Sequence, residues 1–312
     1  MRDVPRRFSC LHASVLLAVI VIGATQGRAA ESSACRELEI KLDLIKPQIT
    51  SVETNQTLFA SADRGCEALA RRVLADGASL EARDRLGAMP LAHAARAGHT
   101  GLIELFLQKG AAINARNLAG STALYAAAES QRADAVDLLL RAGADPNLPG
   151  RSGVTPLAAA AFAGNDAIAA LLLARGADPN AKDTTGKTAI TYAAARGFRP
   201  IVQRLLDAGV PVDARYGNDL TALMWAAGRA EGADPAATSA VIALLLERGA
   251  TIDAVDNRGR TALMIAAELG DAATVEALLK RGADAGKRDK QGKTALDLAT
   301  SEPVRTALPA SR

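Results

Sequence analysis

Apolar residues in this chain recur in two kinds of block, which alternate along most of its length. One block opens with threonine and continues with alanine and leucine, as in TALYAAAES and TALMIAAELG. The other block contains a run of leucines, as at 138–140, 171–173 and 244–246. Both blocks fit the spacing of a short helix with one apolar face. We therefore predict pairs of antiparallel helices joined by turns.

The alternation is periodic. The threonine-led blocks begin 33 residues apart, with one spacing of 40, and a Gly-Ala pair keeps the same phase. The blocks start at Thr122, Thr155, Thr188, Thr221, Thr261 and Thr294, with earlier copies at Met89 and Gln56. A period of this length indicates a solenoid of stacked helical units rather than a domain with one central core.

Residue types at fixed places in the unit suit the ends of helices. The leading threonine can accept a hydrogen bond as an N-cap, and Pro156 follows one threonine at the first helical position. Glycine is expected to end the first helix of several units in the left-handed conformation. These glycines are Gly98, Gly164, Gly197 and Gly270.

With this period and this threonine-led helix start, the chain resembles the ankyrin-repeat family, whose unit has a T-P-L-H-x-A core. The resemblance covers 56–308, as seven full units and a truncated last unit. It implies an all-α solenoid with β-turn or hairpin fingers, and a groove that binds another protein. The core histidine of the family is replaced in this chain, so we expect its hydrogen bonds to be absent. The replacing residues are Ala92, Tyr125, Ala158, Thr191, Met224 and Met264.

Both ends of the array are expected to be capped. Residues 30–55 are predicted to form a capping helix that ends near Pro47, because their apolar residues fall on one helical stripe between charged residues. At the other end, a first helix is expected over 294–299, followed by a short polar remainder and a tail at 309–312.

The spacing of 40 leaves seven extra residues between Ala227 and Val241. Asp234 followed by Pro235 is a favourable start for a helix, so the second helix of this unit is expected to begin a turn early. The insertion can be neutral drift in a loop or part of a functional surface, and the sequence leaves both interpretations open.

Residues 1–29 are predicted to be a cleaved signal peptide. Three arginines precede a mostly apolar stretch at 11–24, and Gly27-Arg28-Ala29 offers the small-x-small pattern of a cleavage site. The apolar stretch is short for a membrane span, which needs about 20 residues. A retained membrane anchor is the alternative. Cleavage would leave a periplasmic or secreted protein without an integral membrane segment, and the Ala-, Arg- and Gly-rich composition is typical of a bacterium.

Composition and motifs argue against several kinds of chemistry. Residues 1–29 hold four arginines and one aspartate, so the rest of the chain has no net charge and is not expected to bind nucleic acid. The Gly-Lys-Thr triplets at 186–188 and 292–294 lack the upstream glycine of a phosphate loop. His99 stands at the family's structural Gly-His position, and His93 is expected near the surface. We expect no metal, no cofactor and no enzymatic activity.

The cysteines suggest one disulfide. Cys10 leaves with the signal peptide, so Cys35 and Cys66 remain as an even pair in an oxidising compartment. Cys66 starts the second helix of the first unit, and Cys35 starts the predicted cap that packs against that unit. We predict a Cys35–Cys66 disulfide, with two unconnected buried thiols as the alternative.

The candidate binding surface is the concave face of the fifth and sixth units. Residues four, seven and eight after each leading threonine share one helical face. Large aromatics beside arginine stand at these places in the two units, and tyrosine, tryptophan and arginine dominate binding hot spots. The predicted site comprises Tyr192, Arg196, Trp225 and Arg229 on helices, with Tyr216, Arg258 and Arg260 on fingers. Packing between units is the alternative, above all for Trp225, and the basic fingers suit an acidic partner.

Two functions are compatible with these patterns. The first is an interaction module, acting as a monomer: a scaffold, inhibitor, immunity factor or chaperone-like partner of another exported protein. The second is a structural envelope protein that binds cell wall or a membrane surface rather than one defined partner.

Overall fold

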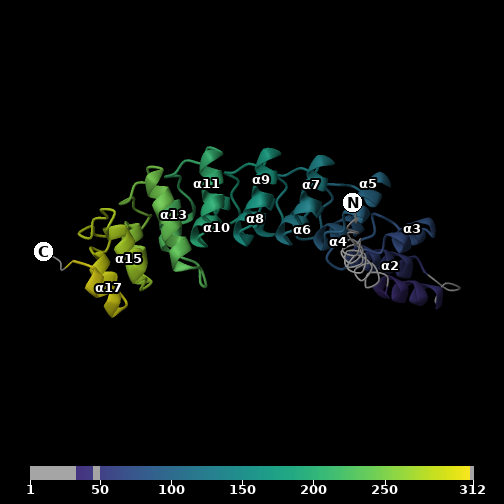
Figure 1. Cartoon of the computed structure of the whole chain (residues 1–312), viewed down its shortest axis with the longest axis horizontal. Coiled ribbons are helices and arrows are strands. Elements are labelled where there is room, and N and C mark those ends of the chain that lie inside the picture. The colour runs from purple at the N-terminus through teal and green to yellow at the C-terminus, as the bar shows by residue number, and fades with distance from the viewer. Residues whose placement is uncertain (1–32, 45–49, 310–312) are drawn as a thin grey trace, which may run out of the picture.

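The computed structural model describes residues 33–44 and 50–309, which form an elongated, gently curved array of helix pairs (Figure 1). Helical backbone covers 33–44. The first helices of the pairs are α2 (Ser51–Arg64), α4 (Pro90–Ala97), α6 (Ala123–Glu129), α8 (Pro156–Ala163), α10 (Ala189–Ala195), α12 (Ala222–Ala227), α14 (Ala262–Glu268) and α16 (Ala295–Leu298). The second helices are α3 (Glu67–Ala75), α5 (Thr100–Gln108), α7 (Ala133–Arg141), α9 (Asp166–Ala174), α11 (Arg199–Asp207), α13 (Pro235–Glu247), α15 (Ala272–Leu279) and α17 (Glu302–Ala307).

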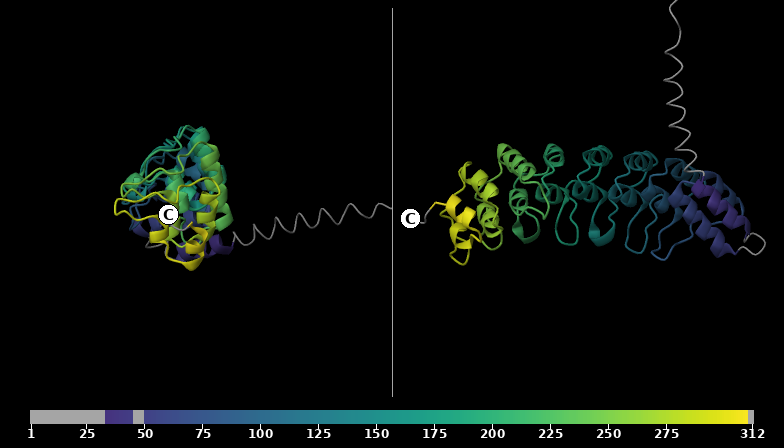
Figure 2. Two further views of the ribbon diagram at one scale, coloured as in Figure 1. Left: turned by 90° about the vertical axis from the view of Figure 1, so that its left-hand side faces the viewer. Right: turned by 60° about the horizontal axis from the view of Figure 1, so that its bottom comes forward.

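The two kinds of helix form two layers. In Figure 1, α6, α8 and α10 lie along the inner side of the curve, and α7, α9 and α11 lie along the outer side. The loops between units reach out to one side of the array as fingers (Figure 2). Two fingers contain short 3-10 turns, at Arg151–Gly153 and Gly217–Asp219, and the described residues contain no strand beyond an isolated bridge between Tyr216 and Leu220. The predicted all-α solenoid is confirmed.

The helix ends follow the chemistry expected of the repeat. Five leading threonines accept a hydrogen bond from the backbone N–H three residues on, at 3.2 to 3.3 Å. These are Thr122, Thr155, Thr221, Thr261 and Thr294. Thr188 differs, because its own backbone N–H donates to the hydroxyl of Thr191 at 3.1 Å. The glycines predicted to end first helices all have positive φ, between 74° and 88°.

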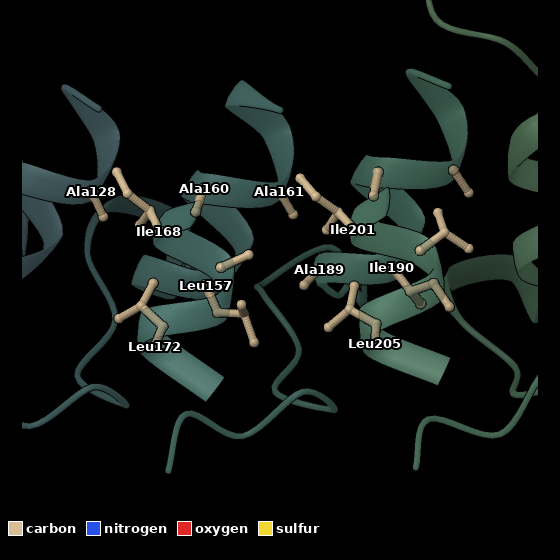
Figure 3. Close-up of a cluster of buried hydrophobic side chains, with 14 of the residues drawn as sticks. Ala128, Leu157, Ala160, Ala161, Ile168, Leu172, Ala189, Ile190, Ile201 and Leu205 are labelled. Atoms are coloured by element: carbon tan, nitrogen blue, oxygen red, sulfur yellow. The ribbon is translucent and has the colours of Figure 1, made fainter. Parts of the chain in front are cut away.

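The core runs the length of the array between the two layers. Small alanines of the first helices, such as Ala160 and Ala161, are fully buried and let neighbouring units approach closely (Figure 3). Larger side chains of the second helices, such as Ile168, Leu172 and Leu205, fill the space between layers and are also fully buried. Burial of apolar surface stabilises a folded chain by about 25 cal/mol per Å². In this array each unit buries that surface mainly against its two neighbours.

The seven extra residues act in the way predicted for the start of α13. Asp234 caps the helix by accepting from the backbone of residues 236 and 237, and Pro235 is its first residue. As a result α13 has 13 residues, against 9 in α9 and α11. The preceding loop folds back on the fifth unit, where the backbone N–H of Ala230 donates to the carbonyl of Ala195 at 2.8 Å.

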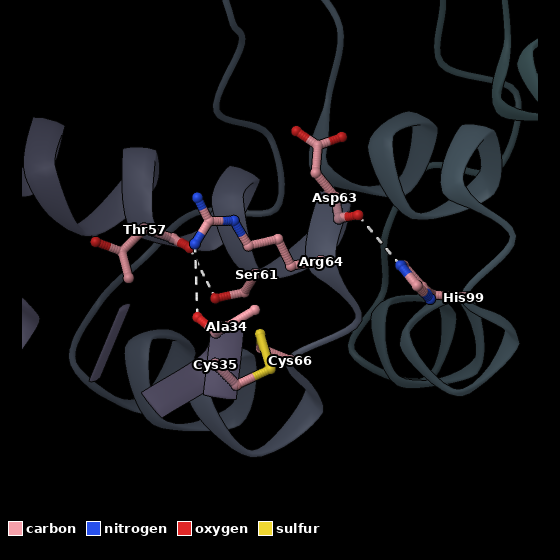
Figure 4. Close-up of a disulfide and its surroundings, with 8 residues drawn as sticks. All are labelled: Ala34, Cys35, Thr57, Ser61, Asp63, Arg64, Cys66 and His99. Carbon is pink, nitrogen blue, oxygen red and sulfur yellow. Dashed lines mark hydrogen bonds between the residues drawn. A yellow bond between two sulfur atoms is a disulfide. The ribbon is translucent and has the colours of Figure 1, made fainter. Parts of the chain in front are cut away.

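A helix over 33–44 covers the N-terminal end of the array. It is joined to the first unit by the predicted disulfide between Cys35 and Cys66, whose Cα atoms are 5.4 Å apart (Figure 4). Arg64 of α2 donates to the carbonyl of Ala34 at 3.5 Å, and Leu42 is buried in the core.

The first unit begins earlier than the repeat phase predicts. Residues 51–55 were expected in the cap, but they form the start of α2. The reason is a capping box, in which Thr50 and Glu53 each accept from the other's backbone N–H. Pro47, where the cap was predicted to end, lies outside the described residues.

The C-terminal end also differs from the expectation of a lone first helix with a polar remainder. Residues 302–307 form α17, which packs against α15 and completes an eighth helix pair. Val304 is fully buried and Leu308 is 5% exposed. The sequence prediction missed this helix because most of its residues are polar. Two apolar side chains, Val304 and Leu308, are enough to cover the end of so thin an array.

No helix in the described part of the chain is both long and apolar enough to cross a membrane. The predicted signal peptide at 1–29 lies outside the described residues.

We expect Asp166→Asn to lower the free energy of unfolding at pH 7 by about 0.5–1 kcal/mol, as for a partly exposed ion pair. Arg204 donates two hydrogen bonds to the Asp166 carboxylate, at 2.8 and 2.7 Å, and these hold the pKa of Asp166 below its ordinary value. Because the folded-state pKa is lowered, this stabilisation is present above the unfolded-state pKa of about 3.9 and is lost as the pH falls through the folded value. Urea midpoints at pH 7 and pH 3 measure the change.

Asp134→Asn serves as the control, because Asp134 also lies in the first turn of a second helix, α7, and makes no ion pair within the described residues. A difference between Asp166→Asn and the native chain that is as large at pH 3 as at pH 7 would contradict the role given to Arg204.

Candidate functional site

Three aromatic side chains lie in a row on neighbouring first helices of the concave face. Phe162 comes from α8, Tyr192 from α10 and Trp225 from α12. The rings of Phe162 and Tyr192 meet edge to face, with centroids 5.8 Å apart. The ammonium of Lys187 lies over the next two rings, 5.7 Å from the centroid of Tyr192 and 5.2 Å from that of Trp225. Phe162 is 51% exposed, so the row offers an open apolar surface.

Arg196 joins this row at the end of α10. Its guanidinium carbon lies 4.5 Å from the ring centroid of Phe162 and 5.6 Å from that of Phe198. Contacts of this kind between a cation and aromatic rings are worth about 0.5–2 kcal/mol. The two rings therefore fix the position of the guanidinium at the concave surface.

Two hollows open between the fingers and the first helices. The first, of about 490 Å³, lies over α4 and α6, and the second, of about 510 Å³, lies over α6, α8 and α10. They share Tyr125, Glu129 and Arg151. The two hollows therefore adjoin and together extend from the second unit to the fifth, where Phe162 and Arg196 line the far end.

The boundary between the two hollows is a hydrogen-bonded group. The hydroxyl of Tyr125 donates to the carboxylate of Glu129 at 3.2 Å, and Arg151 approaches the same carboxylate at 3.6 Å. Burial, aided by the Glu129 charge, raises the pKa of Tyr125 to about 12. Tyr125 is therefore a neutral phenol that donates to Glu129, and Arg151 offsets the Glu129 charge.

Tyr192 is held in a similar way. Its hydroxyl donates to Asp183 of the preceding finger. Burial, together with the hydrogen bond to Asp183 and its negative charge, raises the pKa of Tyr192 well above its ordinary value. Burial alone would raise the pKa of Asp183, but hydrogen bonds from Tyr192, Thr185 and the backbone of Lys187 lower it overall. Asp183 is thus an ionised carboxylate whose acceptor sites are already occupied from within the chain.

Tyr216 is not part of the surface, contrary to the prediction. It is 6% exposed and packs into the core, where burial raises the pKa of its hydroxyl against a smaller opposing contact with Thr188. The reason is its place in the repeat. Tyr216 stands where other fingers carry an inward-pointing aspartate, such as Asp183 or Asp256.

The remaining residues of the predicted site, which are four arginines and one tryptophan, differ in their surroundings. Arg196 and Trp225 lie on the aromatic row with Tyr192, although Trp225 is half-buried. Arg260 was expected to be exposed but is 9% exposed, because its guanidinium pairs with Glu268 of α14. Arg229 pairs with Asp271 at 3.4 Å, and Arg258 stays 53% exposed on its finger.

The structure adds residues that the sequence prediction did not single out. Phe162 occupies one of the concave positions read from the repeat, but no arginine lies beside it within its own unit. Its partner, Arg196, comes from the next unit. Tyr125 and Glu129 lie on α6, and Arg151 lies on the finger that follows α7. For Phe162 and Arg196 the signal is a pairing between units, which a comparison of positions within one unit does not detect.

His93 was expected near the surface but is 7% exposed. Its Nδ1 lies 3.0 Å from a carboxylate oxygen of Asp63, and its Nε2 lies 3.1 Å from one of Asp84. It therefore links the end of α2 to the following finger, in place of the family's core histidine one residue earlier. The structural role expected of His99 is confirmed, since its Nε2 lies 3.2 Å from the carbonyl of Asp63.

We expect Gly164→Ala to destabilise the fold more than Gly176→Ala. Both glycines have positive φ, of 76° and 83°, so alanine at either position costs about 1 kcal/mol or more. A Cβ at Gly164 would also lie 2.6 Å from the ring of Phe198, whereas a Cβ at Gly176 meets nothing within 4 Å. Overpacking of this kind adds about 1–3 kcal/mol.

Guanidinium denaturation of both glycine variants measures this difference. Equal losses at the two positions would show that the Phe198 ring moves aside freely and does not hold Arg196 in place.

Comparisons with known proteins agree with this architecture. A family model described as ankyrin repeats (3 copies) matches residues 58–150, 91–183, 157–237 and 235–307, well over half of the chain. The chain therefore belongs to the ankyrin-repeat family. It is similar to the crystal structure of the human ASB11 ankyrin repeat domain, with 27% sequence identity and a TM-score of 0.63 over 70% of this chain and 96% of that one. None of the curated proteins compared with it matches.

Proposed function

We propose that the mature chain is an exported interaction module that binds one protein partner along its concave face. Ankyrin repeats generally mediate protein–protein interaction. The observation that carries the proposal is the row of Phe162, Tyr192 and Trp225 with Lys187 and Arg196 over its rings. Aromatic side chains and arginine are the residues that contribute most to protein interfaces.

Two observations support export. The pattern of residues 1–29 is that of a signal peptide. The Cys35–Cys66 disulfide fits an oxidising compartment, since such bonds are rare in the cytosol. Periplasmic or secreted location is part of the same proposal.

The test is purification of the full chain, tagged at its C-terminus, from its native cells after chemical crosslinking. We expect one stoichiometric protein partner, and a mature N-terminus that follows Ala29. Sedimentation with cell-wall or membrane fragments, without a defined partner, would favour the structural envelope protein instead. An intact residue 1 on the purified chain would contradict cleavage of the signal.

A further inference from the structure

Arg196 is a cation whose charge the chain itself does not neutralise. Within residues 33–44 and 50–309, no carboxylate lies within ion-pair distance of its guanidinium, and its Nε is buried without a hydrogen-bond partner. By contrast, Arg151 and Arg229, at the same surface, face Glu129 and Asp271. The Phe162 and Phe198 rings hold the Arg196 side chain in place, so little rotamer freedom remains to be lost when an anion binds.

The hollow beside Arg196 is lined by apolar and aromatic side chains, by the neutral polar side chains of Gln131 and Ser152, and by Arg151, which pairs with Glu129. Ala159, Ala163 and the half-exposed ring of Phe162 line it. The hydroxyls of Tyr125 and Tyr192 donate to carboxylates of this chain. Tyr125 is 5% exposed, so Tyr192 is the tyrosine that offers ring surface. The two features that a ligand can match most strongly are the unpaired charge of Arg196, which suits an anionic group, and the exposed ring of Phe162, which suits an apolar group.

The closeness of these two features limits the spacing of the groups. The guanidinium carbon lies 4.5 Å from the centroid of the Phe162 ring, which is 51% exposed, so a carboxylate at Arg196 and an apolar group on the exposed part of this ring would be neighbours. In an extended segment, side chains two residues apart point to the same side and lie about 7 Å apart. Neighbouring side chains point to opposite sides.

We infer that this hollow binds an extended segment of the partner protein, in which an acidic residue lies two positions from a large apolar residue. This inference rests on the proposed function. The acidic side chain pairs with Arg196 and the apolar side chain covers Phe162. Lys187, over the rings of Tyr192 and Trp225, extends the preference for acidic residues toward the sixth unit. This assigns a sequence preference to the partner and places its centre one to two units N-terminal to Trp225.

The experiment is selection of displayed random 12-residue peptides on the mature chain with its disulfide intact. We expect enriched peptides to carry Asp or Glu two positions from Phe, Trp, Leu or Ile. Binding of an enriched peptide, by isothermal titration, should weaken at least tenfold with Arg196→Gln and with Phe162→Ala. Arg141→Gln is the matched control, because it removes an arginine whose side chain is 58% exposed on the outer-side helix α7 and should leave the affinity unchanged.

A double-mutant cycle separates contact from general damage. Replacing the peptide's acidic residue with its amide should weaken binding to the native chain tenfold, but should have no further effect on Arg196→Gln. Melting temperatures of all variants identify any that fail to fold, and Arg196→Lys, which keeps the charge, should keep part of the affinity.

Enriched peptides without this acidic and apolar pairing, or a selection that yields nothing above the starting library, would overturn the inference. Capture of a native protein partner through the concave face would leave the proposed function standing in that case. The two failures are therefore distinguishable.

Discussion

Removal of the Cys35–Cys66 disulfide will lower the stability of the N-terminal end of the array by about 3–4 kcal/mol. The bond closes a loop with a sequence separation of 31 residues and attaches the helix over 33–44 to the start of α3. In the chain-entropy account, such a crosslink stabilises mainly by restricting the unfolded chain. Because each unit touches its neighbours alone, the loss should stay local. We expect amide hydrogen exchange in α2 and α3 to accelerate by a factor of 100 to 1,000.

The variant is Cys35→Ala with Cys66→Ala, and the native chain reduced with a phosphine is its control. Cys66 is 3% exposed, so alanine there also removes a small amount of packing, whereas reduction does not. Agreement between the two samples assigns the effect to the bond. Exchange in α8 and α9 should be unchanged in both. Unchanged exchange in α2 and α3 would show that the bond contributes nothing to the native fold.

Deletion of residues 300–312 is the second large change, and we expect it to cost about 2–4 kcal/mol at the C-terminal end. The deletion removes α17, which covers α15. Buried apolar side chains such as Val304 and Leu308 contribute roughly 1.5–3 kcal/mol each, less the cost of ordering the segment. Loss of this cover opens the side of α15 that faces α17 to solvent. Thermal unfolding should begin at a lower temperature and become less cooperative.

Deletion of 309–312 is the matched control, since it leaves Leu308 and the whole of α17 in place. We expect its melting curve to superimpose on that of the native chain. If the two truncated chains melt alike, α17 does not act as a cap.

The periodic part of the fold could be predicted from the sequence because each unit repeats the same local chemistry. Thr155 caps α8, Gly164 ends it, and Asp234 starts α13 early, all through contacts within a few residues. The ends were predicted less well. The Thr50–Glu53 capping box and the apolar pair of Val304 and Leu308 lie outside the repeat phase, so alignment of the units gives no information about them.

The candidate site depends on contacts that the repeat phase does not encode. Tyr216 could have been excluded, because its position in the finger is one that points inward in other units. Arg260 could not, since its burial depends on a pair with Glu268. The pairing of Phe162 with Arg196 requires the offset between neighbouring units. The sequence predicted a site on the concave face of the fifth and sixth units, and the contact of Arg196 with Phe162 favours a candidate site that extends into the fourth unit.

Photo-crosslinking in native cells tests the central claim, that the concave face binds a protein partner. A benzophenone amino acid in place of Phe162, on the concave face, should crosslink to one defined protein. The same amino acid in place of Glu104, an exposed residue of the second helix α5 on the outer side, should not. Crosslinking from position 104 with none from position 162 would contradict the account.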